Sequence, residues 1–77
     1  MIEIENYILD EGIIVSIEII ENSKTHPKNW INIIQVKENW KNEIPISFDK
    51  NDLEEKKKFL IAKNKLRKLV KENNEKD

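Results

Sequence analysis

The sequence contains no cysteine, and its 77 residues include one glycine, one histidine and two prolines. Without cysteine there can be no disulfide, thiolate metal site or cysteine nucleophile. One glycine is too few for a glycine-rich phosphate-binding loop. His26 lies in a polar segment without the spaced partners of a zinc site or a hydrolase triad. We therefore expect no metal site, no cofactor and no enzymatic activity.

Long apolar runs are missing as well, since none approaches the roughly 20 residues that cross a bilayer. Residues 1–5 are acidic and have no basic segment before an apolar one, so we expect no secretory signal. A chain without cysteine also fits a reducing compartment. These absences predict a soluble, cytoplasmic protein with no membrane partner.

Isoleucine, lysine, glutamate and asparagine supply 48 of the 77 residues. The codons for Ile, Asn and Lys are AT-rich, so the bias indicates an AT-rich genome, either of a bacterium or of a phage or plasmid in such a host. A chain of this length has room for a single domain, 1–77, with one core and modest stability. Its isoleucines favour strands.

Alternating isoleucines predict two strands, at residues 2–9 and 13–21. The core face of the first is expected to contain Ile2, Ile4 and Ile8. The core face of the second is expected to contain Ile13, Val15, Ile17 and Ile19. Between the strands, Gly12 is expected to supply the positive φ of a hairpin turn.

Two further strands follow a polar loop at residues 22–29. The strand at 30–37 is apolar on both faces, so either both faces are covered or a bulge changes the register midway. A turn is expected at 39–43 and a short strand at 44–48. Pro45 cannot donate to a strand ladder, which predicts an edge strand.

After residue 49 the spacing of apolar residues becomes that of a helix, predicted over about 51–72 and followed by a frayed tail at 73–77. Asn51 is the expected N-cap, with Glu54 reaching back to it. The stripe expected on the sheet is Phe59, Ala62, Leu66, Leu69 and Val70. The predicted fold class is α+β: a small antiparallel meander of three to four strands packed against one long C-terminal α-helix.

Some large side chains fall outside this predicted core. The apolar ones on the helix are Leu53, Leu60 and Ile61, which could cover a sheet edge, meet a partner or form a homodimer contact. The aromatic ones are Trp40, Trp30 and Tyr7. Because tryptophan is enriched at interaction hot spots, Trp40 in its polar stretch is the better interface candidate, while Trp30 is expected to pack over the sheet.

Charge is divided unequally along the chain. Residues 1–22 contain six acids and no base, and we call these acids the acidic hairpin: Glu3, Glu5, Asp10, Glu11, Glu18 and Glu21. Residues 56–71 contain eight bases and no acid: Lys56, Lys57, Lys58, Lys63, Lys65, Arg67, Lys68 and Lys71. Such a separation predicts one strongly positive surface.

Three interpretations of this charge remain open. The lysines could form only a solvated helix face, they could neutralise nucleic-acid phosphates, or a charged face could bind a protein. Arginine, the commonest reader of guanine, occurs once, which makes nucleic acid the alternative. The acidic hairpin could compete with DNA or RNA for a basic groove, as a phage anti-defence or anti-CRISPR protein would. We therefore predict a small non-enzymatic protein-binding module, an inhibitor or accessory factor of a larger nucleic-acid-handling assembly. A structural homodimer subunit is the third possibility.

Overall fold

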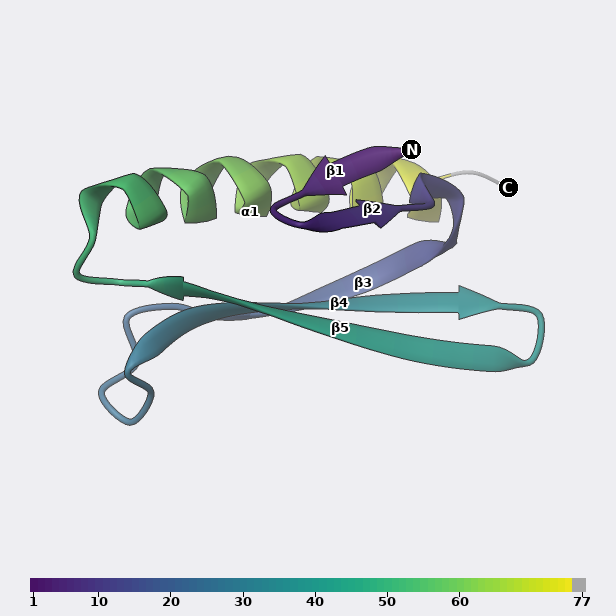
Figure 1. The fold of residues 1–77 in the computed structure, drawn as a ribbon. Helices are drawn as coiled ribbons and strands as arrows, with labels where there is room; N and C mark the ends of the chain where they lie inside the picture. Colours follow the sequence, from purple (N-terminus) through teal and green to yellow (C-terminus); the bar gives the residue numbers. More distant parts are fainter. Residues whose placement is uncertain (76–77) are drawn as a thin grey trace.

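The computed structural model describes residues 1–75 and contains seven elements (Figure 1). They are β1 Ile2–Ile4, β2 Tyr7–Leu9, the 3-10 turn η1 Glu11–Ile13, β3 Ile14–Ile20, β4 Lys28–Lys37, β5 Trp40–Asp49 and α1 Leu53–Asn74. β3, β4 and β5 form an antiparallel meander, while β1 and β2 form a separate hairpin. α1 and the hairpin lie on the same side of the three-stranded sheet (Figure 1). The predicted α+β fold, an antiparallel sheet packed against one long C-terminal helix, is confirmed.

The core lies between the two layers and contains side chains from both. The sheet side contributes Ile14, Ile31, Ile33, Ile46 and Phe48, the hairpin contributes Ile2, Ile4 and Leu9, and α1 contributes Phe59, Ala62 and Leu66. The rings of Phe48 and Phe59 meet edge to face, with centroids 5.5 Å apart, which is a favourable aromatic geometry. Leu69 and Val70 pack against the cluster. The helix stripe predicted to face the sheet therefore does so.

Residues 2–9, predicted as one strand, form the β1–β2 hairpin instead. A two-residue loop at positions 5 and 6 divides them, and Glu5 adopts a φ of 53°. Leu9 is consequently buried, whereas Ile8, which was expected in the core, is exposed. The loop contains neither glycine nor proline, so the alternation of apolar residues hides it in the sequence.

The prediction that Gly12 supplies a positive φ is wrong. Residues 11–13 form η1, and no glycine in the described part of the chain has a positive φ. Asp10 caps this turn, because its Oδ1 accepts a hydrogen bond from the Gly12 backbone N–H at 3.0 Å. The aspartate side chain therefore shapes the turn that the glycine was expected to shape.

Replacing Gly12 with alanine is expected to change the free energy of unfolding by less than about 1 kcal/mol, toward higher stability. A Cβ at this position would meet only the flexible Asp10 carboxylate, at 3.4 Å, and alanine narrows the conformations of the unfolded chain. Urea denaturation followed by circular dichroism measures the change. A loss of several kcal/mol would show that the turn needs glycine after all.

A bulge in β3 decides which of its isoleucines reach the core. Ile14 pairs with Gln35 and Ser16 pairs with Ile34, so Val15 is an extra residue without its own partner. The bulge puts Ile14 in the core, together with Ile17 and Ile19 further along the strand. The predicted core positions Ile13 and Val15 are only partly buried. The sequence suggests a bulge in the neighbouring strand, whereas the structure has it in β3.

β4 and β5 form a long hairpin of ten residues each, joined at positions 38 and 39, with Glu38 at a φ of 55°. The turn predicted at 39–43 and the strand predicted at 44–48 are corrected, because β5 begins at Trp40. Pairing with β4 extends the strand through polar residues that alone favour a turn. β5 pairs only with β4, so Pro45 is on an edge strand as predicted.

A lysine of the β5–α1 connection holds the loop between β3 and β4 through two hydrogen bonds. Lys50 Nζ donates to the carbonyl oxygens of Ser23 and His26, at 2.7 Å each. Within the loop, Asn22 has a φ of 56°, a left-handed conformation that asparagine tolerates. This loop connects Glu21 to Asn29 at the start of β4, so it brings these two residues close together.

α1 begins at Leu53 with Asp52 as its N-cap, which corrects the prediction of Asn51. Asp52 Oδ1 accepts hydrogen bonds from the backbone N–H groups of Glu54, at 2.9 Å, and Glu55, at 3.4 Å. Both residue types can cap a helix, so the sequence alone does not separate the two positions. Glu54 and Glu55 fall in the first turn, where the helix dipole favours acids.

The C-terminal end of α1 is anchored, which corrects the frayed tail predicted from residue 73. The helix continues to Asn74, and Asn73 Nδ2 donates to the carbonyl oxygens of Glu11, at 2.7 Å, and Ile14, at 2.9 Å. These bonds join the last helical turn to η1 and the start of β3. The rest of the predicted tail, residues 76–77, lies outside the described residues.

Candidate functional site

Four branched aliphatic side chains of α1 and β2 remain exposed. Leu53 is 73% exposed, Leu60 47%, Ile61 67% and Ile8 71%. Leu60 and Ile61 follow Leu53 by seven and eight positions, which is about two helical turns. The three residues therefore share one side of α1, opposite the buried stripe. The structure therefore places Leu53, Leu60 and Ile61 in solvent and not over a sheet edge.

Ile8 belongs to the same surface through its neighbour Glu3. The two residues pair across the β1–β2 hairpin on its outward side. Glu3 in turn lines a shallow hollow of about 150 Å³ with Ile61 and Lys65 of α1. At Glu3 the hairpin thus adjoins α1 beside Ile61. We call the surface made of Ile8, Leu53, Leu60 and Ile61 the outer face.

Lysines of α1 lie beside this outer face, and most of them are free of ion pairs. Two of them are paired. Lys63 Nζ is 2.8 Å from Glu21 Oε1 and 5.4 Å from the centroid of the Phe59 ring. Lys58 Nζ is 4.0 Å from Glu55 Oε2. The remaining bases have no carboxylate partner among residues 1–75: Lys56, Lys57, Lys65, Arg67, Lys68 and Lys71. The outer face is therefore apolar, with unpaired bases along α1 and with Glu3 and Glu5 at its hairpin edge.

The six carboxylates of the acidic hairpin lie in different parts of the structure and have different partners. Asp10 caps η1, Glu21 pairs with Lys63, and Glu11 Oε1 is 2.7 Å from the Met1 ammonium, whose pKa it raises above 8.0. Glu3 and Glu5 line the hollow beside α1. These carboxylates therefore do not form one continuous acidic surface.

Glu18, the sixth of these acids, lies on the opposite side of the molecule. It is exposed on the face of the β3–β4–β5 sheet that points away from α1. Asn32 Nδ2 donates there to Glu43 Oε1 at 2.9 Å and to Glu18 Oε1 at 3.5 Å. Trp30 is on this sheet face too, paired with Ile20 and Ser47. This second surface is distinct from the outer face and is mildly acidic.

The aromatic candidates are spread over three places. Trp30 is partly buried on the far side of the sheet, as described above. Trp40 is 48% exposed at the start of β5, beside the β4–β5 turn, and Tyr7 is 42% exposed on the hairpin. The β4–β5 turn projects beyond the C-terminal end of α1 (Figure 1). The structure does not bring Trp30, Trp40 and Tyr7 together.

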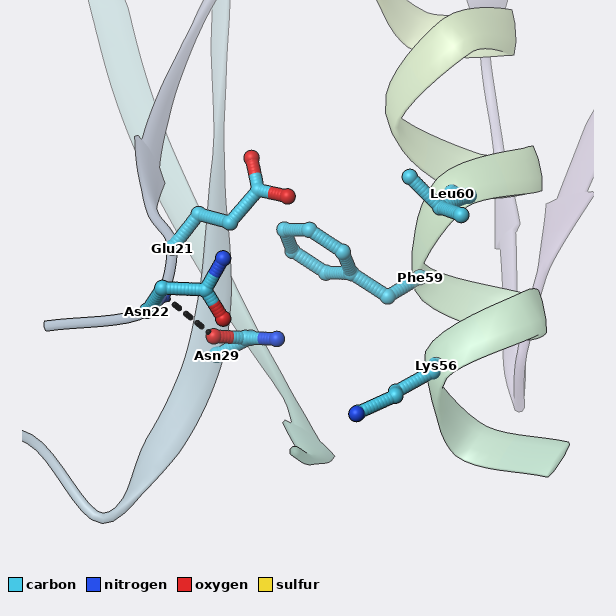
Figure 2. A pocket seen from close by; sticks show the side chains of 6 residues that line it. All are labelled: Glu21, Asn22, Asn29, Lys56, Phe59 and Leu60. Atoms are coloured by element: carbon cyan, nitrogen blue, oxygen red, sulfur yellow. Dashed lines mark hydrogen bonds between the residues drawn. The ribbon is translucent and has the colours of Figure 1, made fainter. Parts of the chain in front are cut away.

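A pocket of about 160 Å³ lies between the β3–β4 connection and the first half of α1 (Figure 2). It is lined by Glu21, Asn22, Asn29, Lys56, Phe59 and Leu60. Leu60 is shared with the outer face, so the pocket opens at the rim of that surface. Figure 2 shows the Lys56 side chain extending from α1 toward Asn29, with the Phe59 ring beside them.

Asn29 is the residue of this pocket that the sequence analysis missed. It is only 4% exposed, and its Oδ1 accepts a hydrogen bond from the Asn22 backbone N–H at 2.9 Å. That bond fixes the amide, so Nδ2 points the other way, toward α1 (Figure 2). Nδ2 has no acceptor among residues 1–75. The alternation of Ile31 and Ile33 gives residue 29 an inward position, although the polar residues before it are typical of a loop.

Comparisons with known proteins do not identify this site. No protein-family model matches the chain, and neither curated proteins nor solved structures give a significant match. Within residues 1–75 no helix has the length and apolar character needed to cross a membrane. In the same part of the chain, no three His, Asp or Glu side chains are grouped as metal ligands would be.

Proposed function

We propose that this protein is a small, non-enzymatic binding module of the cytoplasm that docks on another protein through its outer face. The exposure of Ile8, Leu53, Leu60 and Ile61 on one surface supports this proposal. A small domain that buries its other isoleucines fully or in part gains no stability from leaving these side chains in water. Exposed apolar groups gathered on one face are typical of interaction sites.

The charge around the outer face specifies the chemistry of the partner. Six bases without carboxylate partners among residues 1–75 lie along its α1 side, so a surface that combines acidic and apolar residues would complement it there. A second copy of this chain would bring like charges together around the same apolar centre, which disfavours a homodimer through this face. Nucleic acid could use the lysines but would leave the apolar side chains uncovered.

The role of such a module is that of an inhibitor or accessory factor of a larger assembly. Its small size and AT-rich coding bias fit a protein carried by a phage or other mobile element. An acidic partner surface of this kind belongs to a protein component and not to the nucleic acid itself. Binding there would act by blocking or recruiting that component, as an anti-defence protein does.

The double substitution Leu60→Ser, Ile61→Ser is expected to weaken partner binding at least about tenfold, since each large apolar side chain contributes about 1.5–3 kcal/mol when fully buried. Both residues are exposed, so the variant should keep the wild-type circular dichroism spectrum. The partner is first isolated from the native host by affinity capture, and its dissociation constant is then measured by isothermal titration calorimetry.

Val36→Ser serves as the matched control, because Val36 is a half-exposed apolar residue on the far side of the sheet. Equal affinity of the double variant and the wild type would reject the outer face as the contact. A mass of twice 9.2 kDa by light scattering would favour a homodimer instead. Salt-sensitive binding of an oligonucleotide at about 50 mM salt would favour the nucleic-acid alternative.

A further inference from the structure

The pocket beside Leu60 contains two hydrogen-bond donors that no protein group uses. One is Asn29 Nδ2, on a side chain 4% exposed, and the other is the Lys56 ammonium, which has no ion-pair partner among residues 1–75. Both face the same hollow (Figure 2). We propose that this pocket binds a carboxylate side chain of the protein partner, with Lys56 Nζ and Asn29 Nδ2 as donors and the Phe59 ring as its apolar wall.

The orientation of Asn29 is the feature that makes this a built site. Although the residue as a whole is 4% exposed, its Nδ2 atom lies at the surface of the pocket, where water or another acceptor from outside can reach it. Here the Asn22 N–H holds the amide oxygen, so the amide cannot turn its nitrogen away from the pocket. Nδ2 is therefore positioned in advance for an acceptor that comes from outside the chain.

The charge of the lining selects an anion of low charge. Glu21 is the acid in the wall, and Lys63 neutralises it at 2.8 Å. Lys56 then leaves a net positive charge in the pocket. A carboxylate, with one negative charge and two acceptor oxygens, matches one ammonium and one amide donor. A phosphate dianion would bring a second negative charge that the single Lys56 ammonium does not balance.

The size of the pocket indicates a side chain and not a free cofactor. About 160 Å³ is well below the roughly 300–1,000 Å³ of sites for cofactors and drug-sized ligands. The apolar part of an aspartate or glutamate side chain would lie against Phe59 and Leu60. This inference rests on the proposed function, because the pocket opens at the rim of the outer face and supplies its first specific contact with an acidic partner.

The test titrates acetate, as a carboxylate probe, into the full chain. Binding is monitored by ¹⁵N NMR. Sodium acetate is titrated up to about 0.2 M against sodium chloride at the same ionic strength, so that general screening is matched. Saturable shifts of the Asn29 side-chain NH₂ signals are expected with acetate and not with chloride. Lys56→Met, which keeps the length of the side chain, should weaken acetate binding about tenfold.

Lys57→Met is the matched control, since Lys57 is exposed one residue along α1 and does not line the pocket. It should bind acetate as the wild type does. Shifts of equal size in the Lys56→Met variant, or no saturation at Asn29, would overturn the proposal. Tighter binding of inorganic phosphate than of acetate would also overturn it, in favour of a phosphate site.

The partner measurement separates this inference from the proposed function. If acetate does not bind while Leu60→Ser, Ile61→Ser still abolishes partner binding, the carboxylate pocket is rejected and the docking face stands. If acetate binds at Asn29 but the double variant keeps full partner affinity, the docking face is rejected and the partner's carboxylate with it, and the pocket remains only as a site for a free carboxylate. If both are correct, Lys56→Met should weaken the partner by at least about fivefold, and Lys57→Met should weaken it less.

Discussion

Replacing Phe59 with alanine is expected to lower the free energy of unfolding by about 3–5 kcal/mol. The side chain is almost fully buried and its ring meets Phe48 edge to face, so the substitution removes an aromatic pair and leaves a cavity between helix and sheet. It also removes the ring beneath the Lys63 ammonium. For a small domain with a total stability near the lower end of about 5–15 kcal/mol, most of the folded population would be lost at 37 °C.

Leu60→Ala is the matched control for this prediction. It truncates the neighbouring residue on the same helix, but about half of the Leu60 side chain is already in water. Its effect on stability should stay within about 1 kcal/mol. Urea denaturation monitored at 222 nm compares the two variants. Similar losses for both would mean that α1 does not pack on the sheet through Phe59.

Replacing Asn73 with alanine is expected to lower the free energy of unfolding by about 1–3 kcal/mol. The Asn73 amide donates to the carbonyl oxygens of Glu11 and Ile14, and alanine would leave both oxygens without this partner in a partly buried place. Amide hydrogen exchange should rise in the last turn of α1 and in η1 before it rises elsewhere, because these segments lose their link.

Asn74→Ala provides the comparison, since Asn74 is exposed and makes none of these bonds. It should be neutral, or slightly stabilising because alanine favours a helix. Asn73→Asp keeps the size of the side chain but replaces the donor with a carboxylate that faces two carbonyl oxygens. It should therefore destabilise at least as much as alanine does, and a neutral effect would show that the Asn73 bonds do not hold the helix end.

The pattern of apolar residues was sufficient to predict the fold class and the buried side of α1. The buried side of a helix is determined by apolar residues over several turns, so one misassigned residue does not change the predicted side. The strands were harder, because a single extra residue reverses which side chains face inward. The bulge at Val15 and the loop at Glu5 each shift the phase in this way. Neither contains the glycine or proline that usually marks such a change.

The candidate site was predicted only in part. Helical spacing predicts that Leu53, Leu60 and Ile61 point away from the buried stripe, but it leaves open whether they cover a sheet edge; in the structure all three are exposed. Their neighbour Ile8 was missed, because its exposure depends on the hidden hairpin loop. Asn29 was missed for another reason: whether its amide nitrogen has a partner depends on a contact with Asn22 across a loop, and no spacing in the sequence reports that contact.

The link between Asn73 and the carbonyls of Glu11 and Ile14 also constrains when this domain can fold during synthesis. A two-stranded hairpin is marginal by itself, and β1–β2 buries its apolar side only in the cluster that contains Phe59 and Leu66 of α1. α1 ends 65 residues after β2, so at about 5–20 residues per second the N-terminal hairpin must wait roughly 3–13 s for the helix to be synthesised. The β3–β4–β5 meander has only neighbouring partners and can form earlier. Folding of the N-terminal segment is therefore completed after α1 has left the exit tunnel.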